Sequence, residues 1–137
     1  MRYLLDTNIV IYTIKRRPPQ VAARFAERQA GELCLSSISL SELLFGAAKS
    51  QQPAKALEAI SAIGEALEVA PFDEAAARAY GPLRAELERQ GRPIGALDTL
   101  IAAHALALDA TLVTHNVSEF SRVPGLRVED WCAGLAW

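Results

Sequence analysis

Short hydrophobic runs alternate along this chain with longer segments in which hydrophobic residues recur every three or four positions. The short runs are rich in β-forming residues and predict strands at about 2–5, 33–36, 68–70, 111–114 and 126–128. The longer segments have the period of amphipathic helices, which we expect at about 8–15, 19–31, 39–48, 53–67, 73–89 and 96–108. Strands that alternate with helices are typical of a parallel sheet with helices on both faces. The pattern therefore predicts a single three-layer α/β/α domain over residues 1–137, with a central parallel sheet of four to five short strands.

Residues with known terminal preferences mark the expected helix ends. Pro19 suits the first turn of the second helix, and Gly31 is expected to end that helix. Ser39 and Glu42 have the spacing of a capping box, in which the two side chains bond reciprocally to backbone N–H groups. We therefore expect the third helix to begin at Ser39.

Composition and charge narrow the function classes. With 14 Lys and Arg against 16 Asp and Glu, the net charge is −2, so no overall basic field attracts a polyanion. This disfavours a metal-free nucleic-acid binder, but it is compatible with an enzyme that meets phosphates through bound cations. The two cysteines, Cys34 and Cys132, lie far apart without a zinc-binding spacing, which indicates reduced thiols and a cytoplasmic location. We expect no signal peptide, and no apolar run approaches the roughly 20 residues of a membrane span.

Several polar residues stand just after predicted strands. Asp6 follows the first strand, Glu42 lies in the helix after the second strand, and residues 114–116 (Thr-His-Asn) follow the fourth strand. The carboxyl ends of parallel strands share one edge of the sheet, where open α/β sheets bind their ligands. Carboxylates that gather without Lys or Arg indicate a hard cation such as Mg²⁺. Asp98 follows a glycine turn at a helix start, and the pattern alone does not place it at this edge.

Each acid also has a purely structural interpretation. Asp6 is a good helix N-cap, Glu42 can serve the capping box alone, and Asp98 can complement a helix dipole. His104 lies on the apolar face of its helix, so we interpret it as a core residue. His115 is given no role. Spacing alone leaves both the metal site and the structural interpretations open.

Four motifs, taken together and in this order, resemble a known family. They are LDTN at 5–8, SSISLSELLFGAA at 36–48, IGALDTLIAAH at 94–104 and LVTHN at 112–116. The chain resembles the PIN-domain ribonucleases and, within them, the VapC toxins of type II toxin–antitoxin systems. The resemblance extends over essentially the whole sequence.

The resemblance implies roles for individual residues. Asp6, Glu42 and Asp98 match the three acids that hold Mg²⁺ or Mn²⁺ in the family. Asn116 stands where many PIN domains have a fourth, catalytic Asp, and an amide adds no negative charge for a second metal ion. Glu119, three residues later, is a candidate to supply that acid.

The resemblance also implies polar groups around this site. Asn8 and Thr114 match residues that orient ligands and waters. Lys15, Arg16 and Arg92, with Arg84 and Arg89, are candidates for steering an RNA backbone.

The activity implied is the metal-dependent hydrolysis of RNA phosphodiesters by water, which leaves a 3′-hydroxyl and a 5′-phosphate. A tRNA substrate is implied, with the anticodon loop of initiator tRNA as the target, and cleavage there inhibits translation. The partners implied are a second copy of the chain in a homodimer and a small VapB-like antitoxin. The C-terminal segment of such an antitoxin wraps the toxin and can place a basic side chain in the acidic pocket.

Two alternatives stand beside this interpretation. One is an interaction module that kept the PIN fold and lost its chemistry, although three intact acids argue against it. The other is a haloacid-dehalogenase-like phosphatase, which also has an Asp after its first strand. That class requires a second Asp two residues later, where this chain has Asn8.

Overall fold

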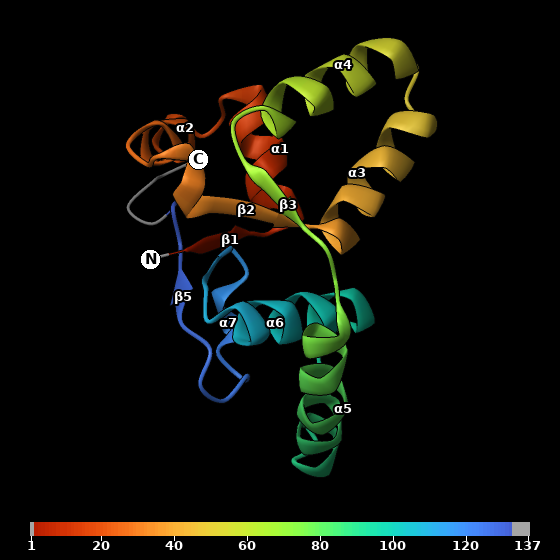
Figure 1. Ribbon diagram of the computed structural model, residues 1–137, viewed down its shortest axis with the longest axis vertical. Helices are drawn as coiled ribbons and strands as arrows, with labels where there is room; N and C mark the ends of the chain where they lie inside the picture. The colour runs from red at the N-terminus through yellow and green to blue at the C-terminus, as the bar shows by residue number, and fades with distance from the viewer. Residues whose placement is uncertain (1, 133–137) are drawn as a thin grey trace.

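The structure is a computed structural model that describes residues 2–132, so the expected domain over 1–137 extends beyond the described part at both ends. Five strands and seven α-helices alternate in this part of the chain (Figure 1). The strands are β1 (Tyr3–Leu5), β2 (Leu33–Ser36), β3 (Glu68–Ala70), β4 (Thr111–Val113) and β5 (Val128–Glu129). The helices are α1 (Thr7–Lys15), α2 (Pro19–Ala26), α3 (Ser37–Ala48), α4 (Pro53–Gly64), α5 (Glu74–Arg89), α6 (Ala96–Leu108) and α7 (Val117–Phe120), with a 3₁₀ turn at Ala30–Glu32.

All the strand pairs are parallel, in the order β3-β2-β1-β4-β5. The chain first adds β2 and β3 on one side of β1 and then places β4 and β5 on the other side. Tyr3 and Leu4 pair with Leu33 and Cys34 of β2, and Leu5 pairs with Val113 of β4. The direction of winding therefore reverses at β1, which makes the β1–β4 boundary the topological switch point of the sheet.

Helices cover both faces of the sheet, as the alternation of side chains along β1 requires. Leu4 packs with residues of α5, α6 and α7 in one core cluster. Tyr3 and Leu5 pack on the opposite face with residues of α1 to α4 and with Trp131. Figure 1 shows α1 to α4 on one side of the strands and α5, α6 and α7 on the other. The predicted three-layer α/β/α fold with five short parallel strands is confirmed.

Three predicted helix ends are wrong, since α4 ends at Gly64 and not at about 67, and one helix was missed. The third helix begins at Ser37, because Ser36 is its N-cap and accepts a hydrogen bond from the Ile38 N–H at 3.1 Å. Ser39 is instead buried inside this helix, so there is no capping box with Glu42. Helix α2 ends at Ala26, before Gly31. Helix α7 has only four residues, too few for a periodic pattern to be recognised.

No helix within residues 2–132 combines the length and the apolar character needed to cross a membrane.

Candidate active site

Asp6 lies at the switch point of the sheet, directly after β1, and is buried. Its Oδ1 accepts a hydrogen bond from the Thr7 N–H at 2.8 Å, so it is also the N-cap of α1. Its Oδ2 accepts a hydrogen bond from the Thr114 hydroxyl at 2.9 Å, directly after β4. Asp6 is therefore both a helix cap and a fixed carboxylate at the sheet edge, and the two interpretations of its sequence position are compatible.

Glu42 reaches the same edge from the second turn of α3 and is partly exposed. Its Oε1 accepts a hydrogen bond from the Thr7 hydroxyl at 3.0 Å. Thr7 thus contacts Asp6 through its backbone and Glu42 through its side chain. The predicted capping box is absent, so Glu42 bonds to Thr7 of α1 and not to the start of its own helix.

A buried hydrogen bond ties α3 to α6. The Ser36 hydroxyl, fully buried at the start of α3, pairs with His104 Nδ1 of α6 at 2.8 Å. His104 packs edge-on against Phe72, and burial lowers the pKa of its imidazole. The interpretation of His104 as a core residue agrees with this position. Its bond to Ser36 fixes the helix that carries Glu42 against the helix that carries Asp98.

Asp98, in the first turn of α6, is paired with Glu119 of α7. Burial, the hydrogen bond to Glu119 and the negative charges of Glu119, Asp6 and Glu42 raise the pKa of Asp98 to about 7. Glu119 has the opposite shift: burial raises its pKa, but hydrogen bonds from the Gly95 N–H, from Asp98 and from Asn116 outweigh burial and lower it. Asp98 therefore carries the proton that the pair shares near neutral pH.

The loop before α6 contacts this pair. The Gly95 N–H donates to Glu119 Oε1 at 2.8 Å. A Cβ at Gly95 would lie 3.6 Å from Asp98 Oδ2 and 3.7 Å from Glu119 Oε1. The glycine turn thus carries Asp98 to the sheet edge, a placement that the sequence pattern left open.

Asn116 and Thr114 complete the edge after β4. The Thr114 hydroxyl donates to Asp6 and accepts a hydrogen bond from the Asn116 N–H at 3.0 Å. The Asn116 side-chain amide donates to Glu119 Oε2. Asn8, Tyr12, His115, Asn116 and Asp6 line a cavity of about 250 Å³ at this point. Asn8 therefore shares a cavity wall with Asp6.

The charges of this group fit a hard divalent cation. Burial raises the pKa of Asp6 above its usual 3.8, and the charges of Glu42 and Glu119 raise it further, against hydrogen bonds from Thr114 and Thr7. Among the ion pairs of residues 2–132, none joins a Lys or Arg to Asp6, Glu42 or Asp98. Carboxylate oxygens without a basic partner are the ligand set that Mg²⁺ and Mn²⁺ prefer.

The expected RNA-steering residues lie at different places, and only Lys15 shares a groove with one of the acids. Lys15 lines a groove with Glu42, whereas Arg16 lines a separate depression with Thr13 and Ile63. Arg92 is exposed after the end of α5. None of the three has a described bond to the acids.

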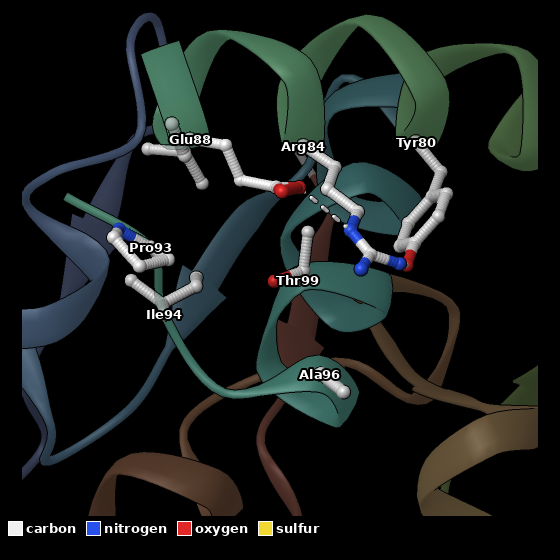
Figure 2. A pocket seen from close by; sticks show the side chains of 8 residues that line it. Tyr80, Arg84, Glu88, Pro93, Ile94, Ala96 and Thr99 are labelled. Atoms are coloured by element: carbon white, nitrogen blue, oxygen red, sulfur yellow. Dashed lines mark hydrogen bonds and ion pairs between the residues drawn. The ribbon is translucent and has the colours of Figure 1, made fainter. Parts of the chain in front are cut away.

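A further cavity of about 240 Å³ lies between α5 and α6 (Figure 2). There the Arg84 guanidinium donates to the Tyr80 hydroxyl and to Glu88, both at 3.0 Å. Arg89 pairs with Glu86 on the same helix. These two guanidinium groups therefore bond to side chains of their own helix, α5.

Sequence reasoning named the acids but missed the groups that join them. Thr7 stands in the LDTN motif between Asp6 and Asn8, and its hydroxyl was given no role. Glu119 was a candidate only for the missing fourth acid, yet it contacts Asp98, Asn116 and the Gly95 backbone. No signal in the sequence pairs residue 98 with residue 119, because that contact depends on where the glycine loop returns.

Comparisons with known proteins agree with this architecture. A family model described as the PIN domain matches residues 3–126. The tRNA(fMet)-specific endonuclease VapC of Shigella flexneri is 48% identical over 131 residues, which are 96% of this chain and 98% of that protein. Ribonuclease VapC2 of Haemophilus influenzae is 44% identical over 96% of this chain and 98% of its own length. A crystal structure of DNA-bound VapBC from Salmonella typhimurium superimposes with a TM-score of 0.91 at 43% identity, covering 96% of this chain and 99% of that chain.

Proposed function

Since this chain belongs to the PIN-domain family and, within it, to the VapC ribonucleases, we propose that it hydrolyses RNA phosphodiesters at the acid pocket formed by Asp6, Glu42 and Asp98. PIN-domain nucleases generally use divalent metal ions. The observation that carries the proposal is the convergence of these acids at the switch point without a paired Lys or Arg. A phosphatase of the haloacid-dehalogenase class is disfavoured by the PIN match and by Asn8.

We assign Mg²⁺ or Mn²⁺ to Asp6, Glu42 and Asp98. A bound ion of this kind polarises the scissile phosphate and makes water a stronger nucleophile. Thr7 and Thr114 hold Glu42 and Asp6 in place, because each hydroxyl donates to one of these carboxylates. The Asn116 amide supplies a neutral donor for a phosphate oxygen at the same edge. The proton shared by Asp98 and Glu119 has to leave when a cation binds, so cation binding weakens as the pH falls.

A tRNA is the substrate that we propose, with the anticodon loop of initiator tRNA as the target. The support is the 48% identity, over nearly the whole chain, to a relative named as specific for tRNA(fMet). Such cleavage inhibits translation, which makes the chain the toxin of a toxin–antitoxin pair. A tRNA substrate also implies a cytoplasmic location.

We propose a VapB-like antitoxin as the partner that silences the chain. An apolar groove of about 370 Å³ lies between α1, α3 and α4, and Glu42 at its wall connects it to the acid pocket. Leu43, Ala47 and Ile60 line it, so it suits an apolar segment that ends in a basic side chain. Homodimer formation is proposed from the resemblance, and the 66% exposed Phe45 on α3 is a large apolar side chain available to a partner.

Regulated expression tests the nuclease. The wild type and Asp6→Ala are induced in matched cells, and RNA 5′ ends are mapped across the transcriptome. We expect growth arrest and one discrete cut in initiator tRNA for the wild type, and neither for Asp6→Ala. Cleavage by the purified chain that survives both Asp6→Ala and excess chelator would contradict the proposed site. Arrest with no cut, or neither effect in the wild type, would favour the inert interaction module.

A second variant tests the groove. A Cβ at Gly46, which lines the groove, meets nothing within 4 Å, so a side chain can start there, and Gly46→Phe places a phenyl ring at the groove. We expect Gly46→Phe to lose co-purification with the short protein encoded beside the chain and to retain RNA cleavage. Gly64→Phe is the matched control, because Gly64 is equally open but is not among the residues that line this groove. Equal co-purification of both variants would contradict the assignment.

A further inference from the structure

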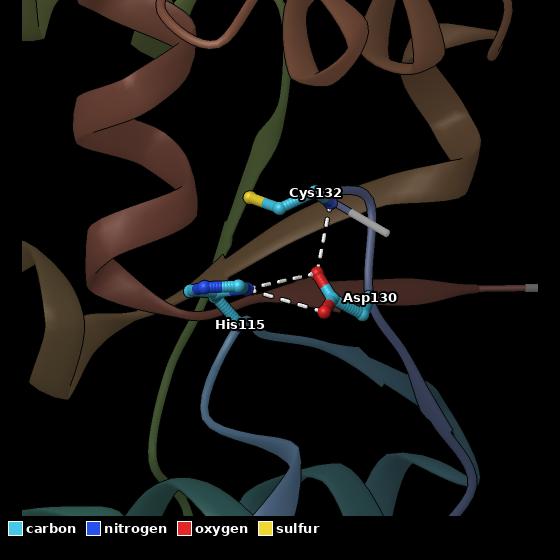
Figure 3. A group of neighbouring side chains, drawn as sticks. All are labelled: His115, Asp130 and Cys132. Carbon is cyan, nitrogen blue, oxygen red and sulfur yellow. Dashed lines mark hydrogen bonds and ion pairs between the residues drawn. The ribbon is translucent and has the colours of Figure 1, made fainter. Parts of the chain in front are cut away.

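A second group of titratable side chains lies beside the acid pocket: His115, Asp130 and Cys132 (Figure 3). One ligand atom from each residue lies within 4.8 Å of the others. His115 Nδ1 is 3.2 Å from Asp130 Oδ2, and Figure 3 shows the Cys132 sulfur above the imidazole. No role was predicted for His115, and Cys132 is one of the two cysteines without a local zinc spacing.

The fold brings these residues together at the ends of β4 and β5. His115 follows β4 by two residues, and Asp130 follows β5 directly. Trp131, between Asp130 and Cys132, is fully buried, packs against Tyr3 and donates from Nε1 to Glu129 at 3.0 Å. This anchor holds the segment of Asp130 and Cys132 against the sheet, so the two ligands are positioned without any ion.

A Cys–His–Asp group also has the composition of a nucleophilic triad, but the thiol is unsuited to attack. Burial and the charge of Asp130 raise the pKa of Cys132 to about 11. The residue is only 2% exposed, whereas reactive cysteines are exposed and have a lowered pKa. A divalent ion can replace the thiol proton, and its positive charge offsets the negative charges of the thiolate and of the Asp130 carboxylate. A neutral substrate does neither.

We propose that His115, Asp130 and Cys132 bind one Zn²⁺ ion at a site separate from the acid pocket. Imidazole nitrogen, carboxylate oxygen and thiolate sulfur are the three ligand types that zinc takes in proteins. In a tetrahedral zinc site such atoms lie roughly 3.3 to 3.8 Å apart, so small side-chain rotations close this group around an ion. A water fills the fourth position from the side of His115, whose side chain is 48% exposed.

The surroundings already orient the carboxylate ligand. The Cys132 N–H donates to Asp130 Oδ1 at 2.8 Å, which leaves Oδ2 for the ion. Metal-binding carboxylates are commonly held by such a second hydrogen bond. Binding through Nδ1 replaces the hydrogen bond between His115 and Asp130 by two bonds to zinc, and the Nδ1 proton of the neutral imidazole moves to Nε2. The one proton released comes from the Cys132 thiol, whose sulfur forms the third bond.

The site lies next to the pocket and does not depend on the proposed nuclease function. His115 lines the same cavity as Asp6 and precedes Asn116 in the chain. Tyr12, on the wall of that cavity, feels the charges of Cys132, Asp6 and Asp130 together. A zinc ion would therefore add positive charge beside the pocket and fix the chain at Asn116.

Zinc binding to the purified full-length chain tests the proposal. Zn²⁺ is titrated against a chromophoric chelator in excess Mg²⁺, which occupies the acid pocket, and Co²⁺ is then used as a spectroscopic substitute. We expect one Zn²⁺ per chain and a thiolate-to-cobalt charge-transfer band. His115→Asn and Cys132→Ser should each weaken binding by more than about 100-fold, since the loss of an outer hydrogen-bonding partner alone costs about 10- to 100-fold. The band should disappear in Cys132→Ser.

Two control variants fix the location of the ion. Cys34→Ala removes the other described cysteine, which is buried and donates to the Tyr3 carbonyl, and should leave zinc binding unchanged. Asp98→Asn alters the acid pocket and should also leave it unchanged. Absence of zinc binding in the wild type would overturn the proposal. Binding that survives His115→Asn with an unchanged fold, or that is lost in Asp98→Asn, would overturn it too. Because His115 is exposed, its variant keeps the test valid if Cys132→Ser unfolds.

Discussion

Two neighbouring groups of titratable side chains lie at one edge of the sheet, and they differ in ligand chemistry. The acid pocket, at the β1–β4 switch point, offers oxygen ligands and shares a proton between Asp98 and Glu119. The group after β4 and β5 offers nitrogen, oxygen and sulfur from His115, Asp130 and Cys132. Oxygen ligands select hard cations, and mixed ligands with a thiolate select zinc. Two neighbouring sites at one sheet edge can therefore prefer different metal ions, because their ligand atoms differ.

The largest expected effect comes from Asp98→Asn. The amide keeps the shape of Asp98 and can donate to Glu119, but the pocket loses one ligand for the hard cation. We expect RNA cleavage to fall by at least about 100-fold, because metal ions supply several kcal/mol of transition-state stabilisation. Purified variants are compared on a labelled tRNA, with Glu65→Gln, an exposed acid on the far end of α4, as the control. Cleavage at the wild-type rate in Asp98→Asn would contradict the role of Asp98 as a ligand of the catalytic cation, and the acid pocket would then not differ from the His115 group in this respect.

Thr114→Val should have the next largest effect. The change keeps the shape but removes the hydroxyl that joins Asp6 to the Asn116 backbone. We expect cleavage to fall by about 10- to 100-fold, as for other partners of metal ligands. Leaving buried Asp6 without this donor should cost about 1–3 kcal/mol of stability.

Thr13→Val is the matched control for Thr114→Val. Thr13 is also buried, and its hydroxyl donates to the Ile9 carbonyl within α1. Cleavage rates and urea unfolding are measured for both variants. If both lower cleavage equally, Thr114 acts through general packing and not through Asp6.

The pH dependence of stability should separate the two groups when no metal is bound. The pKa of Asp98 is about 7 in the folded chain, above its usual 3.8, so the folded chain keeps a proton that the unfolded chain has released. The contribution of this proton to the free energy of unfolding is fully present below about pH 4 and is lost as the pH rises through about 7. The lowered pKa of Glu119 changes stability only below about pH 4.5, where Asp98 is already protonated.

The lowered pKa of His104 acts in the opposite direction below its usual 6.5, so we expect the melting temperature in excess chelator to fall mainly between about pH 6.5 and about pH 8. Asp98→Asn should flatten this dependence, and added Mg²⁺ should restore the stability of the wild type at the higher pH. Differential scanning calorimetry measures both. An equally steep decline in wild type and Asp98→Asn would show that another group titrates.

The smallest effects should come from the basic residues outside both groups. Lys15→Ala, Arg16→Ala and Arg92→Ala should each weaken RNA binding a few-fold, because single phosphate contacts are screened at ordinary salt. A residue that contacts a phosphate should lower the slope of log K against log salt by about 0.7. Binding to a catalytically inactive variant is measured over a salt series. An unchanged slope identifies a residue that does not contact an RNA phosphate.

The centre of the sheet was predictable because β1 and β2 are short, buried and mostly apolar runs, and β1 packs against helices on both faces. The helix starts were harder, since Ser36 and Ser39 are both plausible caps in a serine-rich stretch. Only burial distinguishes them: Ser39 faces the core inside α3, and Ser36 caps the helix.

The acids of the site could be predicted from the sequence, but the hydrogen bonds that join them to their neighbours could not. Asp6 and Glu42 follow strands, so the parallel sheet brings them to one edge. The contact between Asp98 and Glu119 depends on a loop whose path no period encodes. His115 and Cys132 have no zinc spacing in the sequence, because they follow different strands and meet only when β4 and β5 pair.

The position of β1 in the middle of the sheet has a consequence for synthesis. On a ribosome, β1 emerges first, but one of its two neighbours, β4, begins only at Thr111. Until that strand is made, Asp6 lacks the Thr114 hydroxyl and Asp98 lacks Glu119. The partly made chain therefore has no complete pocket, and the nuclease site can form only after residues 114–119 have been translated.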